Sequence, residues 1–231
     1  MDIYSINQTI KKSYFKKTQV SGCLFHLKQN LWDTVSKKGA IDLYNNEKTF
    51  QEIVDFIAAL SYVRSDLVIP FFNEVIEPMI DKLTDEILHE GQDYFDYVVR
   101  TYIGSRAGRS SSRRAPLFRP ELWSSFDDLL TDSPTTNNAL ESWNARWNSA
   151  KMSTSNFWSV VEGFQREDAL AYQRYLSDIS DVQNPNVSPV EGTSRKIKHR
   201  LKMSRLKNVA LKIDFTPPAE YLAIVSSIMR K

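Results

Sequence analysis

Apolar side chains recur at helical spacing along most of this chain, and this periodicity constrains the fold more than any other feature. The clearest stretch runs from Glu47 to about Val63. Its predicted buried face contains Phe50, Ile53, Val54, Ile57 and Leu60. A period close to 3.6 residues is that of a helix with one side against a core. The chain has only seven glycines, which disfavours a sheet-rich fold with many tight turns. We therefore predict a mostly α fold with at most one or two short strands.

Length and hydrophobic content bound the number of domains. The chain has 231 residues, of which 42% are hydrophobic, and domains usually contain roughly 100–200 residues. One large domain or two small ones are therefore expected.

No apolar run approaches the roughly 20 residues that cross a bilayer, and Met1 is not followed by the features of a signal peptide. The sequence thus predicts an intracellular protein without a membrane span, and its single cysteine, Cys23, excludes an internal disulfide.

Changes in composition divide the chain into four predicted segments. Gly104 to Ala115 is rich in Gly, Ser and Arg and lacks an apolar period, which is typical of a loop. A helix is predicted from Asn156 to Leu176, a linker from Ser177 to Ser194 and a basic helix from Arg195 to Leu211. The segments are residues 1–40, with a helix that contains Cys23; 41–134, a helical region with the Arg-rich loop; 135–176, two helices; and 177–231, the linker and basic C-terminal helices.

Positive charge is concentrated in two places, although the formal net charge is only +2. Five arginines and no acid lie between Arg106 and Arg119, and seven Lys/Arg and no acid lie between Arg195 and Lys207. Such blocks can neutralise nucleic-acid phosphates, but they are also common on plain solvated surfaces. The candidate nucleic-acid contacts are Arg106, Arg109, Arg113, Arg114, Arg200, Lys202 and Arg205.

A Cys-x-x-His motif lies in the predicted helix that begins after Ser21. Cys23 and His26 are three residues apart, so a helix places both side chains on one face. Two such ligands would supply half of a zinc site. The alternative is a buried cysteine beside a hydrogen-bonded core histidine, and we favour it because His89 and His199 are isolated in the sequence and no second cysteine is present.

Two acidic residues stand near predicted helix starts. Thr136, Asn137 or Asn138 can cap a helix that carries Glu141 about one turn inside, where the helix dipole favours a negative charge. Asp2 precedes another predicted helix. Taken alone, Glu141 is most simply a solvated glutamate and Asp2 a cap. Two-metal nucleases need several carboxylates around a pair of metal ions, and periodicity alone does not bring these two together.

Short motifs nevertheless succeed one another in a characteristic order. They are Asp2, Phe15, Gly22-Cys23-Leu24-Phe25-His26, Gln29, Trp32, Tyr102-Ile103-Gly104, Pro116-Leu117-Phe118, Trp123 and Thr135-Thr136-Asn137-Asn138-Ala139-Leu140-Glu141-Ser142-Trp143-Asn144. Over residues 1–176 this order and spacing resembles that of the Mutator-like element (MULE) transposases. The resemblance implies a helical insertion attached to the C-terminal part of an RNase H-like fold.

The resemblance also assigns roles to individual residues. It implies that Asp2 and Glu141 are catalytic acids that bind Mg²⁺, and that Cys23, His26, Asn137 and Asn138 support the active site. The chain departs from the family at Tyr4, Thr135 and Asn144, where the family has Glu, Arg and His. The strands that carry the family's first catalytic aspartate are not in this sequence, so we expect no catalysis by the chain alone.

Two classes of function are consistent with this resemblance. The first is a fragment or derivative of a transposase whose full-length parent cuts and joins DNA. The alternative is a domesticated module that binds DNA or protein without cleaving it. In either case we expect DNA as the partner, a nuclear location, possible homo-oligomers and no membrane association.

Overall fold

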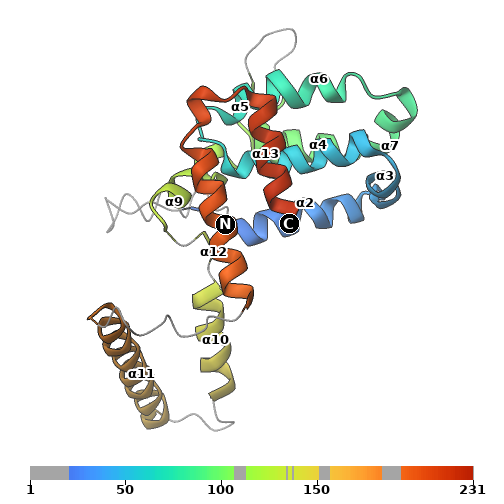
Figure 1. Ribbon diagram of the computed structural model, residues 1–231. Coiled ribbons are helices and arrows are strands. Elements are labelled where there is room, and N and C mark those ends of the chain that lie inside the picture. Colours follow the sequence, from blue (N-terminus) through green and yellow to red (C-terminus); the bar gives the residue numbers. More distant parts are fainter. Residues whose placement is uncertain are drawn as a thin grey trace. The chain divides into compact units, whose positions relative to one another are not determined.

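The computed structural model describes residues 21–106, 113–133, 135–136, 138–150, 157–183 and 194–230. Its described residues form two compact units. The first unit joins the described residues from 21 to 136 to residues 202–230, and the second comprises the described residues between 138 and 201 (Figure 1). Within the described residues the regular elements are helices, apart from one isolated antiparallel bridge between Arg106 and Arg113. The prediction of a mostly α fold with at most short strands is confirmed.

The first unit contains most of the helices. They are α2 (Leu24–Lys37), α3 (Ile41–Asn46), α4 (Lys48–Ala59), η1 (Leu60–Tyr62), α5 (Val68–Phe71), η2 (Phe72–Ile76), α6 (Glu77–Ile80), α7 (Asp85–Val98), η3 (Val99–Ile103), α8 (Pro120–Trp123), α9 (Phe126–Leu130), the C-terminal part of α12 (Ser194–Ala210), η4 (Ile213–Phe215) and α13 (Pro218–Arg230). Among the described residues, no helix is both long and apolar enough to cross a membrane.

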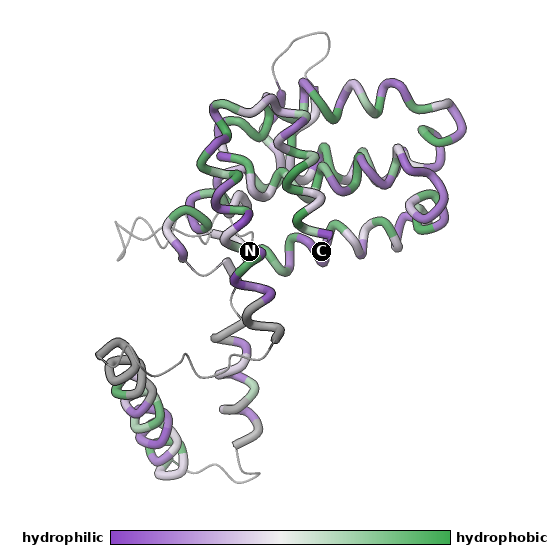
Figure 2. The backbone as a smooth tube through the Cα atoms, viewed as in Figure 1, coloured by the Kyte–Doolittle hydropathy of each residue, from purple (hydrophilic) through white to green (hydrophobic). Residues whose placement is uncertain are grey.

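Helix α4 lies at the centre of the first unit. Its predicted apolar face is buried, with Phe50 and Ile53 fully enclosed. Helix α13 packs against α4 (Figure 1), and it contributes Tyr221, Leu222 and Val225, none of which is exposed to solvent. Apolar positions recur along each of these helices (Figure 2). Residues 202–230 therefore complete the core that begins with α2, which local periodicity did not predict.

The first unit contains two wider, π-helical turns, η2 and η3. In the first, η2 lies between α5 and α6, and Pro78 occupies the start of α6. Proline has no backbone N–H to donate to the preceding turn, and the wider turn η2 directly precedes it. In the second, η3 ends at Gly104, whose N–H donates to the Val99 carbonyl across 2.6 Å. Gly104 has φ +95°, and a Cβ there would lie 2.0 Å from the Arg114 carbonyl oxygen. Only glycine fits this position.

The second unit contains α10 (Asn138–Ala150), α11 (Phe157–Gln183) and residues 194–201 of α12. Trp147 stacks on Trp143 and approaches Phe164, with ring centroids 5.5 and 4.6 Å apart. Gly163 leaves room for this indole, because a Cβ there would lie 3.0 Å from the Trp147 ring. Helix α11 continues to Gln183, seven residues beyond its predicted end at Leu176. The prediction of a linker beginning at Ser177 is therefore wrong.

The basic helix is confirmed, because α12 spans Ser194–Ala210. Two leucines of this helix differ in their surroundings, because Leu206 is buried and Leu201 is 54% exposed.

Candidate nucleic-acid interface

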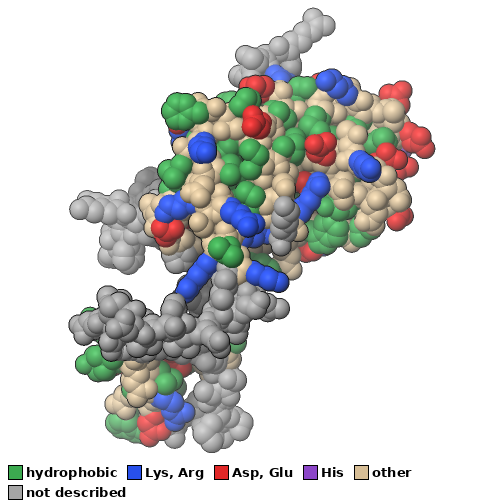
Figure 3. Space-filling model, in the orientation of Figure 1, with side chains coloured by type: hydrophobic (Ala, Val, Ile, Leu, Met, Phe, Trp, Pro, Cys, Tyr) green, Lys and Arg blue, Asp and Glu red, His purple; other side chains and the backbone are tan. Residues whose placement is uncertain are grey.

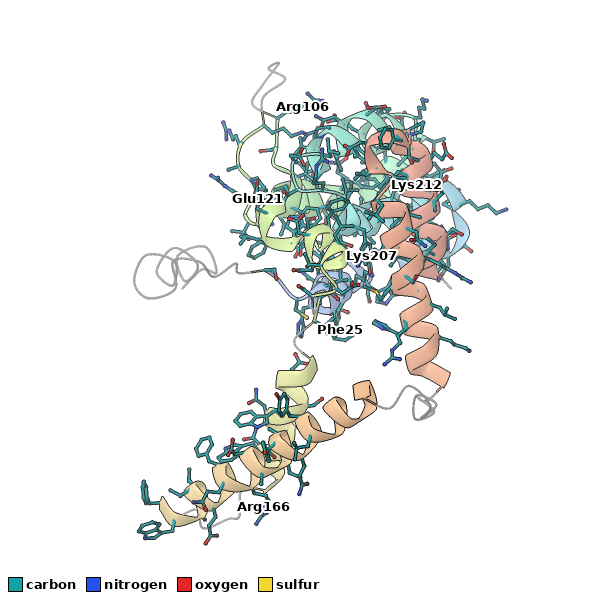
Figure 4. The ribbon with its side chains drawn as sticks, turned by 60° about the vertical axis from the view of Figure 1, so that its left-hand side comes forward. Phe25, Arg106, Glu121, Arg166, Lys207 and Lys212 are labelled. Atoms are coloured by element: carbon teal, nitrogen blue, oxygen red, sulfur yellow. The ribbon has the colours of Figure 1, made fainter. Side chains whose placement is uncertain are left out.

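The C-terminal half of α12, from Lys202 onward, is part of the first unit. Leu206 and Ala210 are buried in the core. Lys207, labelled in Figure 4, donates to a carboxylate oxygen of Asp132 on the turn after α9. These contacts hold the last two turns of α12 in place against the first unit.

The exposed side chains of α12 are strongly basic. Lys198, Arg200 and Arg205 are exposed, and Lys and Arg side chains gather over α12 in the space-filling view (Figure 3). The sequence of α12 contains no acid. No ion pair or hydrogen bond is formed by these three side chains among the described residues. They are therefore available to an external anion.

Lys202 occupies a different environment on the same helix. Its Nζ donates to the Met229 carbonyl oxygen at the end of α13, across 2.6 Å. Burial lowers the pKa of Lys202 below its usual value. Lys202 thus helps to hold α12 against α13, a role that the sequence did not reveal.

The Arg-rich segment after η3 is tied back to the protein by Glu77 of α6. Arg113 donates to Glu77 across 2.8 Å and to Asn73 across 2.7 Å, and its side chain is only 7% exposed. Arg106, labelled in Figure 4, donates from Nε to Glu77 across 3.0 Å. The hydrogen bond from Arg106 holds the pKa of Glu77 below its ordinary value, with a further contribution from the charge of Arg113.

This network gives Arg113 a different environment from the other predicted nucleic-acid contacts. Its guanidinium is buried and donates to Glu77, Asn73 and the Gly104 carbonyl, and a contact of Arg113 with nucleic acid stays a prediction. Arg106 remains at the surface but shares the Glu77 carboxylate. Arg114 is exposed, and Arg109 lies outside the described residues.

The Cys23–His26 motif lines a cavity of about 230 Å³ in the first unit. Cys23 precedes the first residue of α2, and the α2 start is held by two backbone bonds: Gly22 N–H to the Leu122 carbonyl and Leu24 N–H to the Thr135 carbonyl. The structure therefore brings the Gly22–His26 motif together with the Tyr102, Phe118 and Trp123 motifs noted in the sequence. The cavity walls are Ser21, Gly22, Cys23, His26, Leu27, Asn30, Tyr102, Phe118, Leu122 and Trp123.

The cavity is mainly apolar, with a polar corner. Asn30 donates to the hydroxyl oxygens of Tyr97 and Tyr102, each across 2.8 Å, and burial raises the pKa of Tyr102. His26 is exposed and its ring edge meets Phe25 at a centroid distance of 5.4 Å. The prediction of a core histidine beside Cys23 is therefore wrong. Within the described part of the chain, no three His, Cys, Asp or Glu residues gather as metal ligands.

Of the two predicted catalytic acids, only Glu141 lies among the described residues. Glu141 lies in the first turn of α10, as its sequence context predicted, and its side chain is exposed. Asn138 is the first residue of α10. Asp2 and Asn137 lie outside the described residues.

The sequence analysis did not single out Lys28, a basic residue of α2. Lys28 of α2 lies on the flank of the Leu24–Leu27–Leu31 stripe, and its Nζ donates to the Tyr62 hydroxyl across 3.1 Å. Its only sequence signal is a lysine beside an apolar stripe, which is common on any surface helix.

Comparison with known proteins adds no identification. No protein-family model, curated protein or solved structure matches this chain. The similarity to the MULE transposases therefore remains a prediction from the motifs.

Proposed function

We propose that this chain is a DNA-binding fragment or derivative of a MULE transposase that does not cleave DNA alone. One observation carries the DNA-binding part: α12 presents Lys198, Arg200 and Arg205 to solvent on a helix without acids. Lysine and arginine side chains bind backbone phosphates and release condensed counterions. We also propose that the protein is located in the nucleus.

The transposase part of the proposal rests on the order of the sequence motifs. Its support is the meeting of the Gly22–His26, Tyr102 and Trp123 motifs around one cavity, next to the Thr135 backbone that bonds Leu24. By the resemblance, Asp2 and Glu141 would hold Mg²⁺ in the parent enzyme. The described residues alone do not supply a metal-binding set, so we derive no cleavage step for this chain.

The proposal predicts duplex DNA binding that weakens steeply with salt and does not need Mg²⁺. Three phosphate contacts give a slope of about −2.7 in log K against log salt, which is a loss of roughly 40-fold between about 50 and 200 mM salt. Fluorescence anisotropy of a labelled duplex measures this slope. Exchanging Mg²⁺ for EDTA is expected to leave the affinity unchanged and the duplex intact. Undetectable binding at about 50 mM salt would contradict the proposal.

A second candidate function is self-association through α11. Phe164 of this helix faces Trp147 of α10, whereas Trp158, Tyr172 and Leu176 are 70%, 61% and 47% exposed. At about 100° per residue, these three lie within about 40° of one another on the helix. Exposed aromatic side chains on one face of a helix are typical of protein–protein interfaces. We propose that the same face of a second copy covers these three side chains.

Sedimentation velocity tests this self-association. The wild-type chain is expected to form a dimer whose fraction rises with concentration. The double substitution Trp158→Ser with Tyr172→Ser should weaken the dimer at least about tenfold, because aromatic rings contribute much of the energy of such interfaces. Phe215→Ser is the matched control, since Phe215 is 89% exposed in the other unit. A wild-type chain that stays monomeric at every concentration would rule out this candidate.

A further inference from the structure

The cavity beside the Cys-x-x-His motif has aromatic walls. The ring of Tyr102 meets those of Phe118 and Trp123, with centroid distances of 6.1 and 5.8 Å. The Trp123 indole N–H donates to the Phe118 carbonyl oxygen across 3.1 Å, so this polar atom already has a partner. Aromatic surfaces of this kind favour stacked or edge-to-face contacts with another planar ring.

A close approach of two chain segments builds the cavity. Gly22, which precedes α2, donates its N–H to the carbonyl oxygen of Leu122 in α8, and both residues line the cavity. A Cβ on Gly22 would lie 2.9 Å from that oxygen, so a larger residue would push the two segments apart. The packing of the first unit therefore forms the cavity by itself.

One edge of the cavity offers hydrogen bonds to a ligand. The Asn30 amide nitrogen donates to the hydroxyl oxygens of Tyr97 and Tyr102, and these two bonds use both of its protons. Among the described residues, no donor is found for the Asn30 side-chain oxygen. Each tyrosine hydroxyl keeps a proton that rotates to suit an acceptor. Because Asn30 and Tyr102 both line the cavity, this edge presents an acceptor beside a donor.

Size and charge narrow the class of ligand. The cavity volume of about 230 Å³ is below the roughly 300–1,000 Å³ of sites for drug-sized ligands, so it suits one or two fused rings. The described residues that line it include no Lys, Arg, Asp or Glu, and a charged group inside would lose water without gaining an ionic partner. Burial raises the pKa of Tyr102, which keeps its hydroxyl neutral. A neutral planar ligand is therefore favoured.

We infer that this cavity binds a neutral planar heterocycle whose edge has a hydrogen-bond donor beside an acceptor. Nucleobases carry such edges, and their rings stack on aromatic side chains. The ring belongs either to a free nucleoside or to an unpaired base of a DNA strand. The inference goes beyond the proposed function, which concerns phosphate contacts made by α12, and it does not depend on those contacts.

Ligand-observed NMR tests this inference on the full chain. The probe is deoxyadenosine, whose base protons are followed by saturation-transfer difference during a titration. A base of about ten non-hydrogen atoms is expected to bind with a Kd on the order of millimolar or tighter. Toluene is the comparison probe, because it has an aromatic ring without a polar edge.

A cavity-filling substitution shows whether the probes bind in this cavity. Leu122→Trp should weaken both probes at least about tenfold, because the added ring occupies the space of the ligand. Leu117→Trp is the matched control, since Leu117 is 61% exposed and lies outside the cavity lining; it should leave both affinities unchanged. Thermal unfolding shows which variants are folded.

Replacing Asn30 by alanine separates the polar edge from the apolar walls. Deoxyadenosine should bind about tenfold more weakly, as expected for one or two lost hydrogen bonds. Toluene should change by less than about twofold, because apolar contacts do not depend on the amide. An equal loss of both probes in a folded Asn30→Ala chain would overturn the inference, because Asn30 would then only hold the cavity in shape.

A further comparison distinguishes the two sources of the ring. A single strand and the matching duplex, each with one 2-aminopurine base, are added to the wild-type chain and to Leu122→Trp. A fluorescence change that Leu122→Trp removes identifies an unpaired DNA base as the ligand, whereas deoxyadenosine binding without that change identifies the free heterocycle. If neither probe responds to Leu122→Trp, the inference is overturned, even when DNA binds through α12. Conversely, deoxyadenosine has no phosphate, so its binding survives a failure of the proposed function.

Discussion

Replacing Tyr221 by alanine is expected to lower the free energy of unfolding by about 3–5 kcal/mol, the usual cost of removing a large buried aromatic side chain. Tyr221 is fully buried. Its ring meets Phe71 edge to face at a centroid distance of 5.8 Å, and its hydroxyl donates to the Tyr62 carbonyl oxygen across 2.6 Å. Truncation removes the packing and also leaves a buried carbonyl without its donor.

Chemical denaturation monitored by circular dichroism measures this loss. The control is Phe215→Ala, because Phe215 belongs to the same C-terminal segment but is 89% exposed; it should change the unfolding free energy by less than about 0.5 kcal/mol. Tyr221→Phe isolates the hydrogen bond and should cost about 1 kcal/mol. Equal stability of the two alanine variants would show that α13 is not part of the core.

The helices themselves could be predicted from local patterns. The apolar period in Glu47–Val63 leaves one face to bury, and α4 buries that face. Likewise, α2 begins within a few residues of its predicted start, and α12 begins and ends one residue before its predicted bounds. These predictions succeed because each depends on side chains only three or four residues apart.

Which helices pack together could not be predicted in the same way. Tyr221 bonds to Tyr62, which lies 159 residues earlier in the chain. The sequence around either tyrosine does not indicate this contact. Helix α11 also exceeded its predicted length, because the polar residues after Leu176 permit a helix as well as a linker. Composition indicates that such a segment is solvated, but it does not decide between two conformations that both leave polar side chains in water.

The sequence could not show which arginines bond to the protein itself, because their partners also lie far away in the chain. Arg113 and Arg200 both stand in basic segments without acids. Arg113 is nevertheless buried against Glu77, which lies 36 residues earlier in the chain, whereas Arg200 is exposed. The charge pattern correctly located basic segments, but it could not separate an arginine that holds a loop from one that faces solvent.

The largest functional effect is expected from removing the three exposed cations of α12. The triple variant Lys198→Ala, Arg200→Ala and Arg205→Ala should bind duplex DNA about 100-fold more weakly at about 50 mM salt, and its salt slope should be smaller by about 2.7, if each residue contacts one phosphate. Lys202 is left unchanged because it bonds the Met229 carbonyl. Alanine favours helices, so α12 should persist.

The control is a triple variant with the same change in net charge, namely Lys48→Ala, Lys82→Ala and Arg100→Ala. These residues are exposed and lie in the first unit, outside α12. If DNA is attracted only by the overall charge, both triple variants lose the same affinity. If α12 is the binding face, the control keeps nearly all of its affinity and its salt slope. Equal losses in the two variants would assign α12 to ordinary solvated surface, because a contact with phosphate depends on position as well as on charge.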